Sequence, residues 1–386
     1  MKTLLLASAL AFLYPALRAE PENKVILDIM PTQEYPRNSE GAFATLRSGR
    51  IIFCYSQFYG GYGDNDRSRI VEIDSDDGGN TWSPARVIVD HGSNLNAMSV
   101  SLLRLASGKL ALIYLIKKTA LECHPYIQLT SDEGASWSAP VRMINPPGYF
   151  VLNNDRVIQT SRGRLIAPVA FDFENQNSVF PSGDSPATAI WYYSDDGGAT
   201  WKNSLTSWTT PVVSATGMQE PGVVELANGS LFSWSRTDLG TQYVDRSADG
   251  GLTWSSPQPS ELISPESPAS IKRLPHSDAL LAIYNDHSGH FPITAATDPY
   301  MPAVPFSARS PLVAAISTDG GQTWPVRKLL ENEPAGRYCY TSIHFVGDSI
   351  FLAYRIDFTP RIHGPSPEGL RLRRIARAWL ESSPAR

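Results

Sequence analysis

The sequence predicts an all-β fold made of repeated small sheets, and two interleaved repeats carry that prediction. An octamer with the pattern Ser/Thr-x-Asp-x-Gly-x-Thr/Ser-Trp occurs five times, as "SDDGGNTW" at 75, "TSDEGASW" at 130, "SDDGGATW" at 194, "SADGGLTW" at 247 and "STDGGQTW" at 317. In a tight turn of this kind the acidic and hydroxyl side chains bond nearby backbone N–H groups, and the glycine takes positive φ. We expect the tryptophan to pack beneath the turn as a core residue.

The second repeat lies between the octamers, where apolar runs break at a short turn and then return. The turns fall at Gly49, Gly108, Gly163 and Gly229, and more loosely at Asp278 and Gly347. Each run-turn-run unit is typical of a β-hairpin. Hairpin and octamer alternate along the chain, and a sixth hairpin follows the last octamer. Repeats of roughly 50–70 residues, each long enough for four short strands, indicate a six-bladed β-propeller.

The sixth hairpin needs outer strands to complete its blade. Two candidates are "KVILDIM" at 24–30 and "GLRLRRIA" at 369–376. Pairing them would join the two ends of the chain and remove an exposed sheet edge. We therefore predict a single propeller over residues 20–386, with the arginines of 371–377 on a solvated strand face.

The first twenty residues, "MKTLLLASALAFLYPALRAE", have the features of a secretory signal peptide. One lysine precedes an apolar run from Leu4 to Leu13, and small residues precede Ala19. These features predict cleavage after residue 19 and a secreted or periplasmic protein. No later run is long enough to span a bilayer.

Composition excludes several classes of partner and cofactor. A net charge of −5 over 386 residues provides no general attraction to nucleic acid or to an anionic membrane. The three cysteines, Cys54, Cys123 and Cys339, permit at most one disulfide. The histidines in "ECHP" (His124) and "NDHSGH" (285–290) lack a recognisable ligand pattern. We expect a monomer without metal or cofactor.

One hairpin, "GMQEPGVVELANGSLFSWSR" at 217–236, carries a carboxylate at one end and a guanidinium at the other. With a three-residue loop over 227–229, residues whose numbers sum to 456 face one another, and Glu220 faces Arg236. A two-residue loop would place the two side chains on opposite faces. A plain salt bridge at a hairpin end explains the pair as well as a functional site does.

The five octamers resemble the Asp boxes of the sialidase (neuraminidase) superfamily, whose fold is a six-bladed propeller. Asp boxes also occur in propellers that only bind, so function depends on the residues at the centre. The segment "QEPGVVELANGSLFSWSR" is similar to the sialidase segment in which a Glu precedes a Val-Val-Glu-Leu run, a turn and an Arg. That resemblance implies that Glu220 is the catalytic glutamate and Arg236 one of three substrate-carboxylate arginines.

Three further segments resemble sialidase motifs in the same order. "ARSPLVAAISTDGGQTW" implies Arg309 as another of the three arginines. "RYCYTSIHFVGDSIFLAY" resembles the segment that carries the tyrosine nucleophile, which implies Tyr340 rather than Tyr338. "GGYGDNDRSRIVEIDSDDGG" resembles the loop with the acid/base aspartate. Asp64 fits that spacing best and Asp66 second, and an ordinary loop carboxylate is the alternative for both.

The segment "YPRNSEGAFATL" departs from the family pattern. Sialidases have Arg-Ile-Pro here, whereas Arg37 lies about two residues early and Ser39 takes the arginine position. Glu40 is an unusual neighbour for an anionic substrate. Further along, "NNDRVIQ" places residues 153–155 either as polar groups of the pocket or as turn caps.

Taken together, the resemblance implies an exported retaining exo-α-sialidase acting on terminal sialic acid of glycoconjugates. The anomeric carbon of sialic acid bears a carboxylate, which would repel a carboxylate nucleophile but not a neutral phenol. In this interpretation Tyr340 attacks, Glu220 takes its proton, and Asp64 is the acid/base. Arg236, Arg309 and Arg37 bind the substrate carboxylate.

Two other functions are compatible with the sequence. One is a propeller glycosidase or lyase for another acidic sugar, such as a uronate, for which the displaced Arg37 is the main support. The other is a glycan-binding propeller without turnover, which would not need Tyr340, Glu220 and an acid together.

Overall fold

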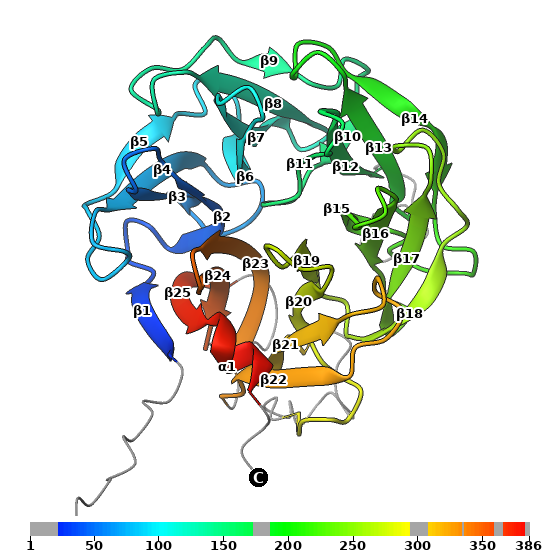
Figure 1. Ribbon diagram of the computed structural model, residues 1–386. Coiled ribbons are helices and arrows are strands. Elements are labelled where there is room, and N and C mark those ends of the chain that lie inside the picture. Colours follow the sequence, from blue (N-terminus) through cyan, green and yellow to red (C-terminus); the bar gives the residue numbers. More distant parts are fainter. Residues whose placement is uncertain (1–21, 173–185, 294–307, 334–335, 359–365, 383–386) are drawn as a thin grey trace, which may run out of the picture.

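The computed structural model describes residues 22–172, 186–293, 308–333, 336–358 and 366–382. Its strands form mostly antiparallel sheets arranged in a ring (Figure 1). Four sheets have four strands each, and a nine-stranded sheet contains two further blades. The predicted all-β, six-bladed propeller is confirmed.

The blades follow chain order, and each runs from an inner strand near the axis to an outer strand. Blade 1 contains β2 (Arg37–Thr45), β3 (Ile51–Phe58), β4 (Ser68–Ser75) and β5 (Arg86–Val89). Blade 2 contains β6 (Asn96–Arg104), β7 (Leu110–Thr119), β8 (Glu122–Thr130) and β9 (Val141–Arg142). The connecting strand β10 (Tyr149–Val151) joins it to blade 3, which contains β11 (Ile158–Gln159), β12 (Leu165–Asp172), β13 (Thr188–Ser194) and β14 (Lys202–Trp208).

The last three blades complete the ring. Blade 4 contains β15 (Gln219–Glu225), β16 (Leu231–Arg236), β17 (Thr241–Ser247) and β18 (Gln258–Ile263). Blade 5 contains β19 (Ser270–Arg273), β20 (Leu280–Asn285), β21 (Leu312–Ser317) and β22 (Val326–Glu331). Blade 6 contains β23 (Arg337–Val346), β24 (Ser349–Asp357), β25 (Gly369–Ala376) and β1 (Asn23–Ile29), and the short helix α1 (Arg377–Glu381) follows β25.

The chain ends close the ring as predicted. β1 pairs antiparallel with β25, from Asn23 opposite Ile375 to Ile29 opposite Leu370. The prediction of a solvated arginine face on β25 is wrong. The side chain of Arg373 is buried against blade 5, where its Nη2 lies 2.7 Å from Oε1 of Glu331, and its Nη1 donates to Asn23 Oδ1 over 2.6 Å.

The octamers form the expected turns. In the first, Ser75 Oγ donates to Asp77 Oδ1 (2.8 Å), and the Thr81 N–H donates to the same oxygen (2.9 Å). These bonds, from Thr81 and then Ser75, lower the pKa of Asp77 to about 2. Gly79 has φ of 86°. The five octamer tryptophans pack against hydrophobic cores, as predicted.

The apolar side chains form six clusters, and each lies mainly between two neighbouring blades. The propeller therefore has layers of core around its axis rather than one central core, which leaves the axis for polar side chains. All three cysteines are buried free thiols. No helix among the described residues is long and apolar enough to cross a bilayer.

Candidate active site

A pocket of about 570 Å³ lies at the centre of the ring, where inner strands and their adjoining loops meet. All six predicted site residues line it, namely Arg37, Asp64, Glu220, Arg236, Arg309 and Tyr340. The two alternatives do not belong to this lining. Asp66 Oδ2 accepts a hydrogen bond from the Gly63 N–H (2.7 Å) within its own turn, and Tyr338 packs in the core between blades 5 and 6.

The hairpin of blade 4 differs from its predicted pairing at one end. The register is as predicted from Gly222 to Glu225, and Gly229 has φ of 80° in the turn. A bulge then shifts the pairing, so that Gln219 rather than Glu220 lies opposite Arg236. The predicted pairing of Glu220 was wrong because an extra residue in left-handed conformation (φ 47°) interrupts the ladder. The bulge turns Glu220 toward the pocket, and its Oε2 lies 3.1 Å from Nη1 of Arg236.

Tyr340 also occupies a bulge, on β23, with φ of 57°. Its hydroxyl donates to Glu220 Oε1 over 3.1 Å. Burial and the charge of Glu220 raise the pKa of the Tyr340 phenol above its usual value, against the opposing effect of Arg309 and Arg236. The phenol is therefore neutral at rest, and Glu220 lies where a base is needed.

Two arginines flank this pair. The charge of Arg236 is compensated by two carboxylates, because its Nη2 lies 2.7 Å from Glu266 Oε1 in addition to the contact of its Nη1 with Glu220. Arg309 is buried, and its Nη1 donates to Cys339 Sγ over 3.0 Å. In the part of the chain that the structure describes, no carboxylate lies within ion-pair distance of Arg309. We call Glu220, Arg236, Arg309 and Tyr340 the nucleophile wall.

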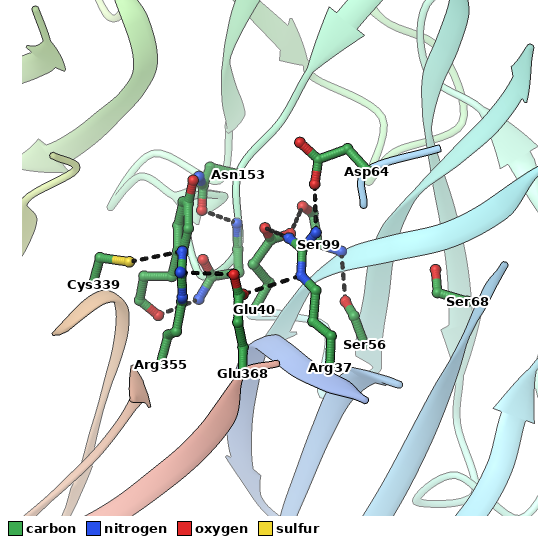
Figure 2. Close-up of polar contacts among 12 residues, drawn as sticks. Arg37, Glu40, Ser56, Asp64, Ser68, Ser99, Asn153, Cys339, Arg355 and Glu368 are labelled. Atoms are coloured by element: carbon green, nitrogen blue, oxygen red, sulfur yellow. Dashed lines mark hydrogen bonds and ion pairs between the residues drawn. The ribbon is translucent and has the colours of Figure 1, made fainter. Parts of the chain in front are cut away.

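The opposite side is formed by blade 1 and by Glu368, and we call Arg37, Glu40, Asp64 and Glu368 the blade 1 wall. Arg37 reaches the pocket although it lies two residues before the family position, because residues two apart on a strand share a face. Figure 2 shows Arg37 among the three carboxylates. The distances are 2.5 Å to Asp64, 3.2 Å to Glu368 and 3.5 Å to Glu40.

The two blade 1 carboxyls that flank Arg37 differ in their environments. The side chain of Asp64 is 67% exposed, and the charge of Arg37 lowers the pKa of its carboxyl. Glu40 is buried, and that burial raises the pKa of its carboxyl to about 7, against the opposing effects of Arg37 and of a hydrogen bond from Ser99.

Sequence reasoning missed several charged residues of the pocket, which are Lys117, Asp172, Arg337, Arg355 and Glu368. Arg355 Nη2 lies 2.7 Å from Glu368 Oε1, and Arg355 Nη1 lies 3.9 Å from the sulfur of Cys339. Arg355 lies within an otherwise mostly apolar strand, and Glu368 is a lone acidic residue before β25. Neither carries a local sequence signal.

Residues 153–155 act between blades. Asn153 lines the pocket, and Asn154 Nδ2 donates to the carbonyls of Tyr340 (3.1 Å) and Gly41 (2.9 Å). Asp155 accepts from the Ile343 N–H (2.9 Å). These bonds fix the backbone of the Tyr340 bulge against blades 1 and 3.

The pocket lining also includes apolar side chains. Met98, Leu115 and Val151 belong to it together with Tyr149, whose ring centre lies 4.9 Å from Lys117 Nζ. Among the described residues, no group of three or more His, Cys, Asp or Glu side chains is arranged to hold a metal ion.

Comparison with known proteins agrees with the fold. The family model of the BNR repeat-like domain matches residues 44–352, whereas no curated protein matches the sequence. A protein of unknown function from Dyadobacter fermentans shares 19% identity, with 92% of this chain and 99% of that chain covered and a TM-score of 0.68.

Two enzymes are similar at lower identity. The leech intramolecular trans-sialidase, solved with 2,7-anhydro-Neu5Ac, is 15% identical over 94% of this chain and 71% of its own, with a TM-score of 0.68. The intramolecular trans-sialidase of Ruminococcus gnavus, solved with oseltamivir carboxylate, is 15% identical over 94% and 99%, with a TM-score of 0.67. At such identities these likenesses show the fold alone. Because the family model covers most of the chain and the propeller agrees with it, the chain belongs to the BNR repeat-like domain family.

Proposed function

We propose that the protein is a retaining exo-α-sialidase that hydrolyses terminal sialic acid from glycoconjugates. The observation that carries the proposal is the 3.1 Å hydrogen bond from the Tyr340 hydroxyl to Glu220, with Arg236 and Arg309 beside it in the pocket. A phenol is a weak nucleophile unless an adjacent base takes its proton. A propeller that only binds glycans has no need for this pairing.

The nucleophile wall supplies the first half of such a reaction. The Tyr340 oxygen forms a bond to the anomeric carbon while its proton passes to Glu220. Arg309, which has no carboxylate partner among the described residues, offers its charge to the substrate carboxylate. Guanidinium groups bind carboxylates through paired, charge-assisted hydrogen bonds.

The remaining sides of the pocket suit the rest of the substrate. The apolar side chains of Met98, Leu115 and Val151 in the pocket lining suit an N-acyl group, which sialic acid has and a simple uronate lacks. The leaving oxygen needs a proton, and the resemblance to sialidases assigns that role to Asp64 on the blade 1 wall.

One observation favours a second candidate, a glycosidase for a different acidic sugar such as a uronate. Arg37, the expected third carboxylate-binding arginine, is already surrounded by three carboxylates. In such an enzyme, Arg236 and Arg309 alone would be sufficient to bind the substrate carboxylate.

The test compares fluorogenic 4-methylumbelliferyl glycosides of sialic acid and of glucuronic acid. We expect release of the fluorophore from the sialoside and none from the uronide. A fluorinated sialosyl donor should then leave one sialosyl group on the peptide that contains Tyr340, measured by mass spectrometry. Turnover of the uronide alone would establish the second candidate, and binding without turnover of either would establish a lectin-like propeller.

We further propose that the protein is exported. Residues 1–19, which lie outside the described residues, have the pattern of a cleaved signal peptide. The mature N-terminus, measured by mass spectrometry of protein secreted from a host with a matching export system, should be Glu20. An intact Met1 on that protein would exclude cleavage.

A further inference from the structure

Several inner strands of the propeller share one backbone feature, a non-glycine residue in left-handed conformation at a bulge. On β2 it is Glu40 (φ 53°), on β15 Glu220 (φ 47°) and on β23 Tyr340 (φ 57°). The strand register shifts at each of these positions. Such conformations cost roughly 1–3 kcal/mol each and persist where the surrounding structure holds a side chain for function. Glu40 is therefore aimed into the pocket by the same feature that aims the proposed base and nucleophile.

The contacts of Glu40 hold it at the pocket wall. Its side chain is 5% exposed, and Ser99 Oγ donates to its Oε2. Ser99 is itself a bulge residue (φ 58°), and its N–H donates to Ser56 Oγ over 3.0 Å. The charged groups that act on Glu40 are Arg37, with Nη2 3.5 Å from Oε1, and the carboxylates of Asp64 and Glu220 at longer range.

Glu40 and Asp64 differ in whether the carboxyl holds a proton close to neutral pH. A group that gives a proton to a leaving oxygen must hold one at the pH of turnover. Burial, helped by the negative charges of Asp64 and Glu220, raises the pKa of Glu40 to about 7. Arg37 instead lowers the pKa of Asp64, with its Nη1 2.5 Å from Oδ1. In the free protein Asp64 is therefore an anion that orients Arg37, whereas Glu40 retains a proton close to neutral pH.

We propose that Glu40, and not Asp64, is the proton donor to the leaving group in this pocket. The inference rests on the proposed function as a retaining glycosidase. In the first step the bond between the glycosidic oxygen and the anomeric carbon breaks, and the Glu40 proton passes to that oxygen. The Tyr340 oxygen bonds to the anomeric carbon, and the Tyr340 proton passes to Glu220. In the second step the Glu40 carboxylate takes a proton from water, whose oxygen bonds to the carbon. Tyr340 then leaves and regains its proton from Glu220, so both groups return to their starting states.

The experiment compares Glu40→Gln with the matched variant Asp64→Asn on aryl glycosides of the sugar that the wild-type protein turns over. The panel pairs a poor leaving phenol, which needs protonation, with an activated nitrophenol, which does not. For Glu40→Gln we expect kcat/KM to fall about 10²–10⁴-fold on the poor leaving group and far less on the activated one. Azide should restore turnover of Glu40→Gln on the activated substrate and yield the glycosyl azide. Asp64→Asn should lower turnover of both substrates by a similar factor.

Three results overturn the inference, and they differ from failure of the proposed function. Glu40→Gln could lose activity equally on both leaving groups, or Asp64→Asn could show the steep dependence on the leaving group instead. Infrared spectra at pH 6 provide a readout that does not need turnover. The wild type and Asp64→Asn should show a protonated-carboxyl band, and this band should weaken in Glu40→Gln. A band of unchanged strength in Glu40→Gln is the third result that overturns the inference. A wild-type protein that turns over neither the sialoside nor the uronide overturns the proposed function, and the donor role with it.

Discussion

The nucleophile wall and the blade 1 wall both present arginine to the pocket, but they differ in how that charge is compensated. Arg37 lies within ion-pair distance of three carboxylates, two of them almost fully buried. Arg309 contacts the sulfur of Cys339 and has no such partner among the described residues. The positive charge of Arg37 is therefore fully compensated within the blade 1 wall, whereas the nucleophile wall keeps positive charge for an anion.

This difference separates the two roles that an arginine takes in a pocket. A guanidinium that satisfies buried carboxylates stabilises the fold, because each unpaired buried charge is costly. A guanidinium without a carboxylate partner is itself costly until a ligand arrives, so its value is in binding. Substitutions on the two walls should consequently affect different measurements.

The largest effect is expected at the nucleophile. Tyr340→Phe keeps the ring and its packing but removes the attacking oxygen, so kcat should fall about 10⁴-fold or more, the scale for loss of a covalent nucleophile. Tyr338→Phe, two residues earlier on the same strand and in the core, is the matched control and should retain turnover. Near wild-type turnover by a folded Tyr340→Phe protein would end the tyrosine mechanism.

The next effect concerns stability on the blade 1 wall. Arg37→Met leaves buried carboxylates without their cation, so the free energy of unfolding should fall by about 3–5 kcal/mol. Without Arg37 the pKa of Glu40 rises further, so the loss is present at pH 8 and shrinks as falling pH protonates that carboxyl. Chemical denaturation at pH 8 and at a lower pH measures this loss of stability. Arg309→Met, the control without a carboxylate partner, should lose clearly less; equal losses would remove the distinction between the walls.

Ligand affinity should show the reverse order. Arg309→Met should weaken binding of an unsaturated sialic acid analogue by about 1.5–3 kcal/mol, the range for a hydrogen bond to a charged group. Calorimetric titrations with the analogue and with its carboxamide separate the contribution of the ligand carboxylate from that of the rest of the ligand. The variant should bind the carboxamide about as well as the wild type does. A similar loss for both ligands would show that Arg309 does not contact the carboxylate.

The smallest effect is expected at a buried carboxyl that has no arginine beside it. Asp245 on β17 is buried, and neither carboxyl oxygen makes a hydrogen bond of normal geometry within the described residues. Burial raises the pKa of this carboxyl, against the opposing effect of Ser233. The protonated form is thus favoured in the folded state, and stability is lost as pH rises above the unfolded value.

Asp245→Asn removes that titration and should be more stable than the wild type by about 1 kcal/mol at pH 7. Near pH 4, the pKa of an unfolded aspartate, the difference should shrink toward zero. Melting temperatures of both proteins between pH 4 and pH 8 provide the measurement. A difference that does not grow with pH would show that the carboxyl of Asp245 is not held protonated.

Blade number and ring closure are predictable from this sequence because their signals are local. In each octamer the side chain of one aspartate bonds groups within four residues, so the motif and its turn are one unit. The alternating runs around each hairpin turn fix which strands pair. The ends of the ring follow because a sixth hairpin lacks other partners.

The pocket was predictable only in part, because bulges carry no periodic signal. One inserted residue on β15 shifted the partner of Arg236 from Glu220 to Gln219. The same kind of insertion on β2 turns Glu40 inward, which its sequence neighbours do not indicate. Arg355 and Glu368 meet only because blade 6 brings β24 and the residue before β25 to the axis. Three-dimensional packing, rather than spacing along the chain, determines these contacts.

The closure of blade 6 by β1 has a consequence for how this chain folds. The first described strand pairs with the last, and Asp28 Oδ2 meets Arg371 Nη2 at 2.8 Å across a separation of 343 residues. Blades 1 to 5 are each contiguous in sequence and can form as synthesis proceeds, whereas blade 6 waits for both ends. Pairings of such high contact order form slowly. An open arc with a bare β25 edge is therefore the expected late intermediate, and such an edge is a template for association between chains until β1 docks.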